Sequence, residues 1–244
     1  MIRLFRPLLP PFLLLVASGI TVAAPDADTL GWEPKYRRTE TIRTSDELYA
    51  AVARANQSGF TELLLESGRY RLPRTLYLRG SAIALRSASG NRDDTVLVGI
   101  GMRRRDRVDN LLVVSGQNIT VQGITLREAG NHLIQVQGEK DADFFSLRDS
   151  ALVNSYEQLL KVSANPKVRE SADSGIVVNN RFVYESRLGP QYYIGGIDAH
   201  GSRDWLVEGN TFLNIASPGE QVAEFAVHFW SGSADNVVRG NFIF

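Results

Sequence analysis

The sequence predicts an all-β fold, a parallel β-helix (β-solenoid) preceded by one short helix. A scaffold of similar residues recurs along the chain, and each copy contains three short apolar or alternating segments. Helical periodicity is confined to one segment near the amino terminus. Repeats made only of short strands are typical of solenoids, because one copy cannot bury its apolar face without its neighbours.

The first residues form a separate segment. A basic start precedes an apolar stretch that ends at Ala23 and Ala24. This order is typical of a secretory signal peptide, and Pro25 disfavours cleavage after Ala24, so residues 1–23 are the predicted signal. No second long apolar stretch follows. We therefore expect an exported protein, periplasmic or extracellular, with no membrane span after signal removal.

Residues 24–60 are predicted to contain a polar, irregular lead-in and then a capping helix. Thr44 and Glu47 have the spacing of a capping box. Apolar side chains follow at helical spacing, at Leu48, Ala51, Val52 and Ala55. We expect this helix to cover the amino end of the solenoid.

Residues 61–244 are the predicted β-helix domain. The second residue of a recurring turn marks each repeat, at intervals of 26, 30, 30 and 31 residues. The markers are Ile124, Ser150, Asn180, Asn210 and Asn241. We expect the asparagines to stack as a hydrogen-bonded ladder. The chain ends within a repeat, at Phe244, without the cap that solenoids need, so the domain is expected to be incomplete.

Phe182 and Phe212 each lie two residues after a marker, and their neighbours in register are Leu126, Leu152 and Ile243. All of these positions are expected to stack inside the solenoid, because side chains at one position of a parallel repeat share one face.

These repeats resemble a known group of proteins. The helix is followed by LLLESGRYRL, and later repeats carry V-x-x-N or V-x-G-N. Both features are similar to the secreted right-handed parallel β-helix proteins of the pectate-lyase-like superfamily, over roughly residues 44–244. The resemblance implies a right-handed solenoid that binds sugar chains on one sheet and its flanking loops. It does not separate lyases, hydrolases, epimerases and non-catalytic members.

One strand of each repeat is expected to carry functional side chains. Because side chains alternate along a strand, Asp198 and His200 face outward if Ile197 and Ala199 face the core. Alignment of the repeats then gives two outer columns. The first is Val113, Gln135, Lys161, Asp198 and His228; the second is Ser115, Gln137, Ser163, His200 and Trp230.

Long inserts adjoin this same strand, at residues 163–175, 185–196 and 214–226. Inserts that gather on one face of a solenoid usually mark its binding face, so we expect them to wall a groove. The candidate substrate-binding residues are Arg187, Tyr192, Tyr193 and Trp230, with Trp230 as a stacking surface for a sugar ring.

The outer columns favour proton-transfer chemistry on an acidic polysaccharide. Lyase and epimerase reactions of uronates need a base for the C5 proton, a group that neutralises the carboxylate and, for elimination, an acid. The candidate base is His200 or Lys161, and the candidate acid is His228 or Tyr193. Asp198 is the candidate orienting partner.

The segment Asp198-Ala199-His200 also loosely resembles the D-P-H-D signature of alginate-epimerase-like β-helices. Ala199 replaces the proline and Gly201 replaces the final aspartate, so neither the substrate nor the role of His200 follows from this resemblance.

Two other functions stay open. Glycoside hydrolysis would need a second carboxylate from Glu220 or Glu224. Alternatively, the outward charges could keep the face of a non-catalytic, polysaccharide-binding or structural module soluble. The formal net charge is zero, which gives no reason to expect a nucleic acid partner. Cysteine is absent and no carboxylates converge on the strand, so we expect no metal and no cofactor.

Overall fold

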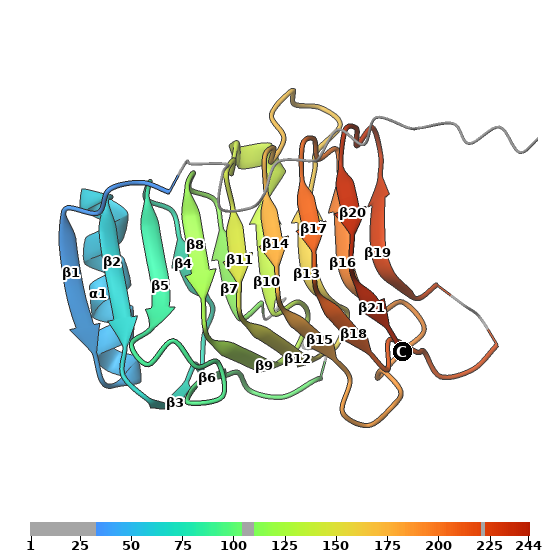
Figure 1. Ribbon diagram of the computed structural model, residues 1–244, viewed down its shortest axis with the longest axis horizontal. Coiled ribbons are helices and arrows are strands. Elements are labelled where there is room, and N and C mark those ends of the chain that lie inside the picture. The colour runs from blue at the N-terminus through green and yellow to red at the C-terminus, as the bar shows by residue number, and fades with distance from the viewer. Residues whose placement is uncertain (1–32, 104–109, 221–222) are drawn as a thin grey trace, which may run out of the picture. The chain divides into compact units, whose positions relative to one another are not determined.

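The structure is a computed structural model that describes residues 33–103, 110–220 and 223–244. The described strands form three parallel sheets, and the chain visits the sheets in the same order in each turn of the solenoid (Figure 1). This confirms the predicted parallel β-helix. One such turn is called a coil below. The predicted signal peptide lies outside the described residues.

Each described strand belongs to one of the three sheets. In the described part of the chain, sheet A contains β1 (Arg38–Ile42), β2 (Thr61–Leu65), β5 (Ile83–Ser87), β8 (Ile119–Gln122), β11 (Ser146–Arg148), β14 (Ile176–Val178), β17 (Leu206–Glu208) and β20 (Val237–Arg239). Sheet B contains β3 (Gly68–Arg71), β6 (Thr95–Val98), β9 (Thr125–Ala129), β12 (Ala151–Ser155), β15 (Arg181–Val183), β18 (Thr211–Leu213) and β21 (Phe242–Ile243). Sheet C contains β4 (Leu76–Leu78), β7 (Leu112–Val114), β10 (Ile134–Gln137), β13 (Gln158–Ser163), β16 (Gly195–His200) and β19 (Phe225–Trp230).

Helix α1 (Ser45–Ser58) lies at the amino end against β1, β2 and β4 (Figure 1). Its predicted capping box is present, because the Glu47 amide donates to Thr44 Oγ1 at 3.2 Å and the Thr44 amide donates to Glu47 Oε2 at 3.3 Å. The predicted apolar face is buried at Leu48, Ala51, Val52 and Ala55. A short 3-10 helix, η1 (Gly138–Lys140), follows β10.

Part of the predicted irregular lead-in is regular structure. Residues 38–42 form β1, which pairs in parallel with β2 from Arg38↔Thr61 to Ile42↔Leu65. Only Ile42 of this strand is buried. A strand with one buried side chain lacks the apolar alternation by which strands are found in a sequence, which explains why the pattern missed it.

The asparagine ladder is confirmed at the short turn between sheets A and B. The backbone amide and Nδ2 of Asn180 both donate to Asn210 Oδ1, at 2.9 and 3.0 Å. Asn210 donates to Asn241 Oδ1 in the same way, again at 2.9 and 3.0 Å. The residue before each of these asparagines has a left-handed backbone, with φ of 57° at Asn179 and 63° at Gly209.

The predicted aromatic stack is also confirmed. The rings of Phe182 and Phe212 lie 4.7 Å apart at 12°, and both side chains are fully buried. The strand register places Leu126, Leu152 and Ile243 at the same position of their own coils. Leu126 and Leu152 are fully buried as predicted, whereas Ile243, at the same position of the last coil, is 66% exposed.

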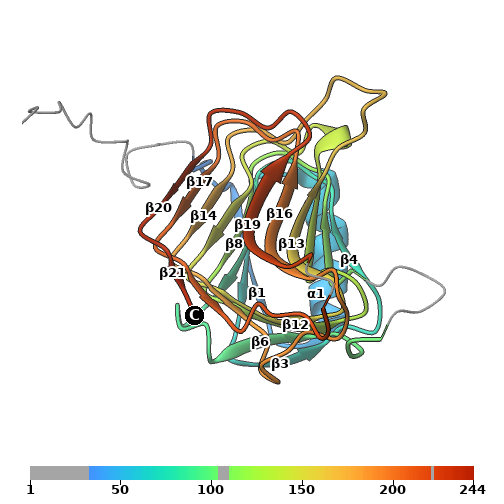
Figure 2. The same cartoon turned by 90° about the vertical axis from the view of Figure 1, so that its right-hand side faces the viewer.

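Sheet C is the face with long connections on both sides. The chain reaches β16 and β19 through residues 184–194 and 214–224, and leaves β13 through residues 164–175. Figure 2 shows β13, β16 and β19 side by side at the carboxyl-terminal end of the solenoid. Within the described residues, no helix combines the length and apolar character that a membrane crossing requires.

Candidate functional site

The register of sheet C brings the predicted outer side chains together. Lys161 of β13 pairs with Asp198 of β16, and Asp198 pairs with His228 of β19. In the neighbouring column, His200 of β16 pairs with Trp230 of β19. The three strands are adjacent in the sheet, so these five side chains occupy one area of its outer face. They are called the cluster below.

Asp198 is the centre of this area, and it is fully buried although it faces away from the core. Its Oδ2 accepts hydrogen bonds from Lys161 Nζ and, at 3.0 Å, from the Tyr193 hydroxyl. His200 Nε2 lies 3.5 Å from Oδ2, and His228 Nδ1 lies 3.5 Å from Oδ1. Position 198 is therefore not part of a solvated surface, which argues against a merely solubilising face.

The surroundings of Asp198 keep it ionised. Burial by itself raises the pKa of this carboxyl, but the hydrogen bonds from His200 and Lys161 and the charge of Lys161 outweigh burial and lower the pKa to about 2. Burial and the neighbouring Asp198 charge raise the pKa of Tyr193. Tyr193 therefore retains its proton at neutral pH and serves as a donor, not as a base.

Lys161 connects the carboxylate to a histidine. Its Nζ contacts both Asp198 Oδ2 and His200 Nε2, the latter at 2.7 Å. His200 Nε2 accepts from Lys161 in one imidazole tautomer and donates to Asp198 Oδ2, 3.5 Å away, in the other. The side chains of Lys161 and His200 are 14% and 19% exposed, so they remain within reach of a substrate at the surface.

Aromatic rings enclose the two histidines. The Trp230 ring, 43% exposed, meets His200 edge-on at 4.4 Å and stacks on His228 at 5.1 Å. Phe225, which the sequence pattern missed, lies 4.8 Å from His228. Gly195 makes room for it, because a Cβ at that position would overlap the Phe225 ring. The Gly-Gly pair at the start of β16 was the available signal for this close approach.

A pocket of about 370 Å³ opens beside His200. Its walls come from the insert after β13 and from the turns that follow β16 and β19. Two exposed arginines line it, Arg169 and Arg203, and neither was predicted from the sequence. They lie in segments without periodicity, so only the folded chain shows that they are close to His200.

The remaining predicted residues are placed less centrally. Tyr192 is 53% exposed and its ring lies 6.3 Å from that of Tyr193. Arg187 is exposed in the turn after β15 and forms no hydrogen bond or ion pair with a described residue of the cluster. Glu224 accepts a hydrogen bond from the Ser217 amide, which holds its carboxylate within its own loop.

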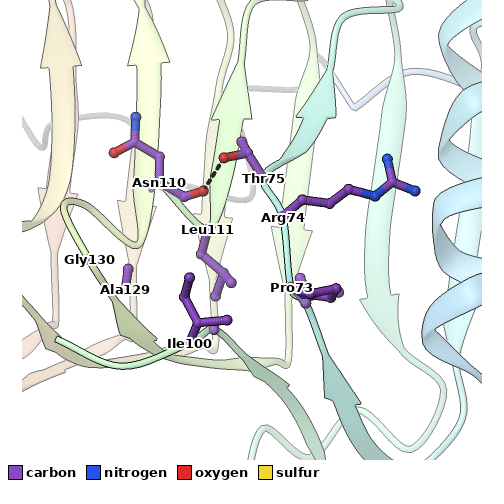
Figure 3. Close-up of a pocket in the computed structure, with 10 residues that line it drawn as sticks. Pro73, Arg74, Thr75, Ile100, Asn110, Leu111, Ala129 and Gly130 are labelled. Atoms are coloured by element: carbon purple, nitrogen blue, oxygen red, sulfur yellow. Dashed lines mark hydrogen bonds between the residues drawn. The ribbon is translucent and has the colours of Figure 1, made fainter. Parts of the chain in front are cut away.

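A second pocket lies near the other end of sheet C, before β4, β7 and β10 (Figure 3). Pro73, Ile100, Leu111 and Ala129 contribute to its wall, and Thr75 Oγ1 donates to the Asn110 carbonyl at 2.7 Å. Its volume of about 10 Å³ has room for little more than one water molecule, so it does not admit a sugar.

Histidine and carboxylate side chains were also compared with the requirements of a metal site. Among the described residues, no group of three or more such side chains is arranged to hold a metal ion. In the cluster itself, hydrogen bonds from Lys161 and Tyr193 already occupy Oδ2 of Asp198.

Comparison with known proteins gives structural neighbours only. No family model and no curated protein matches the chain. An alginate lyase from Paenibacillus sp. str. FPU-7 matches with a TM-score of 0.53 and 18% identity, over 84% of this chain and 76% of that chain. The catalytic domain of a GH87 α-1,3-glucanase in complex with nigerose has a TM-score of 0.43 and 14% identity, over 91% and 47% of the two chains. The PL6 family alginate lyase AlyGC has a TM-score of 0.33 and 14% identity, over 87% and 41%. At these identities the likeness to the first structure shows a shared fold, and the other two carry no argument.

Proposed function

We propose that this protein acts on an acidic polysaccharide and removes the C5 proton of a uronate unit, in a lyase or epimerase reaction. The observation that carries the proposal is the arrangement of Lys161, Asp198 and His200 within the cluster. One buried, ionised carboxylate contacts two groups that can exchange a proton. Such charge-coupled groups at a surface pocket are typical of catalytic sites. The fold shared with an alginate lyase supports the proposal.

His200 is the proposed base, with Lys161 as its partner. In the tautomer with an unprotonated Nε2, the bound sugar displaces the contact of 2.7 Å between Nζ and Nε2, and the freed lone pair of Nε2 takes the C5 proton. Asp198 stays ionised and stabilises the positive charge that the pair gains when it takes the C5 proton. It also holds both side chains in place through Oδ2.

Tyr193 is the proposed acid, with His228 as the second candidate. The raised pKa of Tyr193 keeps its hydroxyl protonated until the leaving oxygen needs a proton. Delivery of that proton to the glycosidic oxygen completes an elimination and leaves an unsaturated uronate. Return of a proton to C5 from the opposite side instead gives the epimer.

Arg169 and Arg203 are proposed to neutralise the uronate carboxylate. Both line the pocket beside His200, and a guanidinium can bind a carboxylate through two hydrogen bonds. Neutralisation stabilises the carbanion that forms when the C5 proton leaves. Trp230, exposed beside the histidines, is proposed to stack on the sugar ring, with Tyr192 and Arg187 farther out. Export, which the amino-terminal sequence predicts, suits a polymeric substrate.

The geometry favours this chemistry over glycoside hydrolysis. Hydrolysis needs two carboxyl groups on either side of the scissile bond. Asp198 is the one carboxylate of the described cluster and is engaged by Lys161, while Glu224 is bound within its loop. Among the described residues, the cluster thus holds one carboxylate, and a second would have to come from Glu170 in the pocket beside His200.

The test uses the full chain with polymannuronate, polyguluronate and polygalacturonate. Ultraviolet absorbance of unsaturated products measures elimination, and proton NMR in D₂O measures exchange at C5. We expect the wild type to be active on at least one polymer. His200→Asn, Lys161→Met and Tyr193→Phe should each lower turnover about 100-fold or more, with melting temperatures that show a folded protein.

Gln137→Ala is the matched control, because Gln137 lies in the same outer column as His200 but two coils away. It should keep wild-type turnover. Wild-type protein that binds these polymers without elimination or C5 exchange would contradict the catalytic proposal and favour a binding module.

A further inference from the structure

The amino-terminal end of sheet C carries a second group of exposed side chains on the same outer face as the cluster. Tyr77 of β4 is in register with Val113, Gln135 and Lys161. It is 42% exposed. Arg79 lies two residues later and therefore on the same face, with its guanidinium carbon 4.3 Å from the centre of the Tyr77 ring.

Two arginines beside β4 form no ion pair with any residue that the structure describes. Arg79 and Arg74 are exposed, and neither forms an ion pair with a described residue. The guanidinium carbon of Arg74 lies 4.0 Å from the Tyr49 ring, and Figure 3 shows Arg74 extending from the segment before β4 toward the helix. A guanidinium held on an aromatic face keeps its hydrogen-bond donors free for a carboxylate ligand.

The backbone beneath these side chains is held by α1. Asn56 Nδ2 donates to the Tyr77 carbonyl at 2.8 Å, and Asn56 Oδ1 accepts from the amides of Arg79 and Gly80 at 2.8 and 3.1 Å. A Cβ at Gly80 would lie 2.8 Å from the Ala55 carbonyl oxygen, so the strand and the helix are in close contact. The aromatic and basic side chains thus project from a fixed support, which lowers the entropy lost on binding.

This group and the cluster lie along one line across the strands. Three coils separate Tyr77 from Lys161, which corresponds to about 14 Å at a strand spacing of about 4.8 Å. The side chains between them in the column, Val113 and Gln135, are uncharged. A distance of about 14 Å is short enough for an extended oligosaccharide of several units to span it. A chain with its reactive unit at the cluster therefore reaches Tyr77 after a few further units.

We propose that Tyr77, Arg79 and Arg74 form a remote subsite for an acidic polysaccharide. Arg79 pairs with the carboxylate of a uronate unit, Tyr77 contacts the face of a sugar ring, and Arg74 adds positive charge beside them. The identity of the ligand rests on the proposed function, whereas the subsite needs only binding, not turnover. The polyanion is favoured over a neutral sugar because an exposed arginine lies on each side of β4, and neither forms an ion pair with a described residue.

The test compares the affinity for long and short oligouronates by calorimetry, with the uronate class that the wild-type chain binds best. Arg79→Ala and Tyr77→Ala should each weaken binding of a long oligomer about tenfold, because a charge-assisted hydrogen bond or a stacked ring is lost. Binding of an oligomer too short to span three coils should not change. Tyr77→Phe, which keeps the ring, should bind like the wild type.

Arg69→Ala is the matched control for lost charge. Arg69 is exposed on β3, in the same coil but on sheet B. An equal loss of affinity in this variant, or equal losses for long and short oligomers in Arg79→Ala, would overturn the subsite. Length-dependent loss in a protein without turnover would support the subsite and contradict the proposed reaction. Turnover that does not depend on Arg79 or Tyr77 would support the proposed reaction and contradict the subsite. A wild type that binds no acidic oligomer would contradict the subsite and the proposed reaction.

Discussion

Asp198 faces away from the core and is still buried, because Tyr193, Lys161 and two histidines close over it. Burial of a carboxylate is costly unless opposite charge and hydrogen bonds compensate for lost hydration. Here an ammonium, a hydroxyl and two imidazoles surround one carboxylate. The energetics of the candidate site therefore depend on this single residue more than on any other.

Asp198→Asn should destabilise the protein by roughly 2 kcal/mol at neutral pH, as the shift of the pKa from 3.8 to about 2 implies. The folded-state pKa lies below the unfolded value. The contribution of Asp198 is therefore fully present above about pH 4 and is lost as the pH falls through about 2. Urea unfolding at several pH values measures both effects.

The difference in stability between wild type and Asp198→Asn should shrink as the pH falls from 4 toward 2. The control is Asp93→Asn, because the Asp93 side chain is 66% exposed and its ion pair within the described residues is with the exposed Arg181. This variant should unfold like the wild type. A wild-type advantage over Asp198→Asn that is constant across the acidic range would contradict the assigned pKa.

Alternation along a strand predicts which side chains of Sheet C face outward, and the register of the repeats predicts that Lys161, Asp198 and His228 are neighbours. Both follow from regular backbone geometry. The burial of Asp198 and the approach of Arg169 and Arg203 depend on inserts without periodicity. Those features could not be predicted, because the path of an irregular segment is set by contacts that local sequence does not encode.

Elements of the solenoid are held by two stacks that run from coil to coil. The asparagine ladder satisfies backbone groups at the turn between sheets A and B, and the aromatic stack fills the interior behind it. Both were predictable, because the same residue type recurs at a constant interval. The strand β1 was not, since Ile42 alone is buried in it.

Phe212→Ala should lower the free energy of unfolding by about 3–5 kcal/mol, because it removes a fully buried ring from between its neighbours in the stack. Phe242→Ala provides the comparison, since Phe242 is 61% exposed and should contribute little. Urea denaturation of both variants measures the difference. Equal stability of the two variants would show that the position of Phe212 in the core is wrongly assigned.

Across the described solenoid, burial decreases toward the carboxyl-terminal coil. All but one residue of β16 are buried, whereas every residue of β19 is partly or fully exposed. Coils in a solenoid are stabilised mainly by their immediate neighbours, so each strand of the candidate site depends on the coils that adjoin it. Lys161 lies on the well-buried β13, and His228 and Trp230 lie on β19.

A short acidic oligosaccharide that contacts both Lys161 and Trp230 should slow amide hydrogen exchange in β13, β16 and β19 more than in β4. Mass spectrometry of peptic fragments measures the change in exchange on binding. Equal slowing in β4 and β19 by an oligosaccharide too short to span three coils would contradict the placement of the site.

The repeated register also has a genetic consequence. Tandem duplication of the segment for one complete coil would extend the solenoid without altering its core, since every coil presents equivalent side chains to the next. Where the duplication falls would decide its effect. Duplication of the coil that contains β16 would leave Lys161 beside the first copy of Asp198 and His228 beside the second copy, so no single carboxylate would lie next to both. An extra coil between β4 and β7 would leave the cluster intact and change only its distance from Tyr77. Gain or loss of coils would thus change the cluster and its distance from Tyr77 independently, which point mutations in the core cannot do.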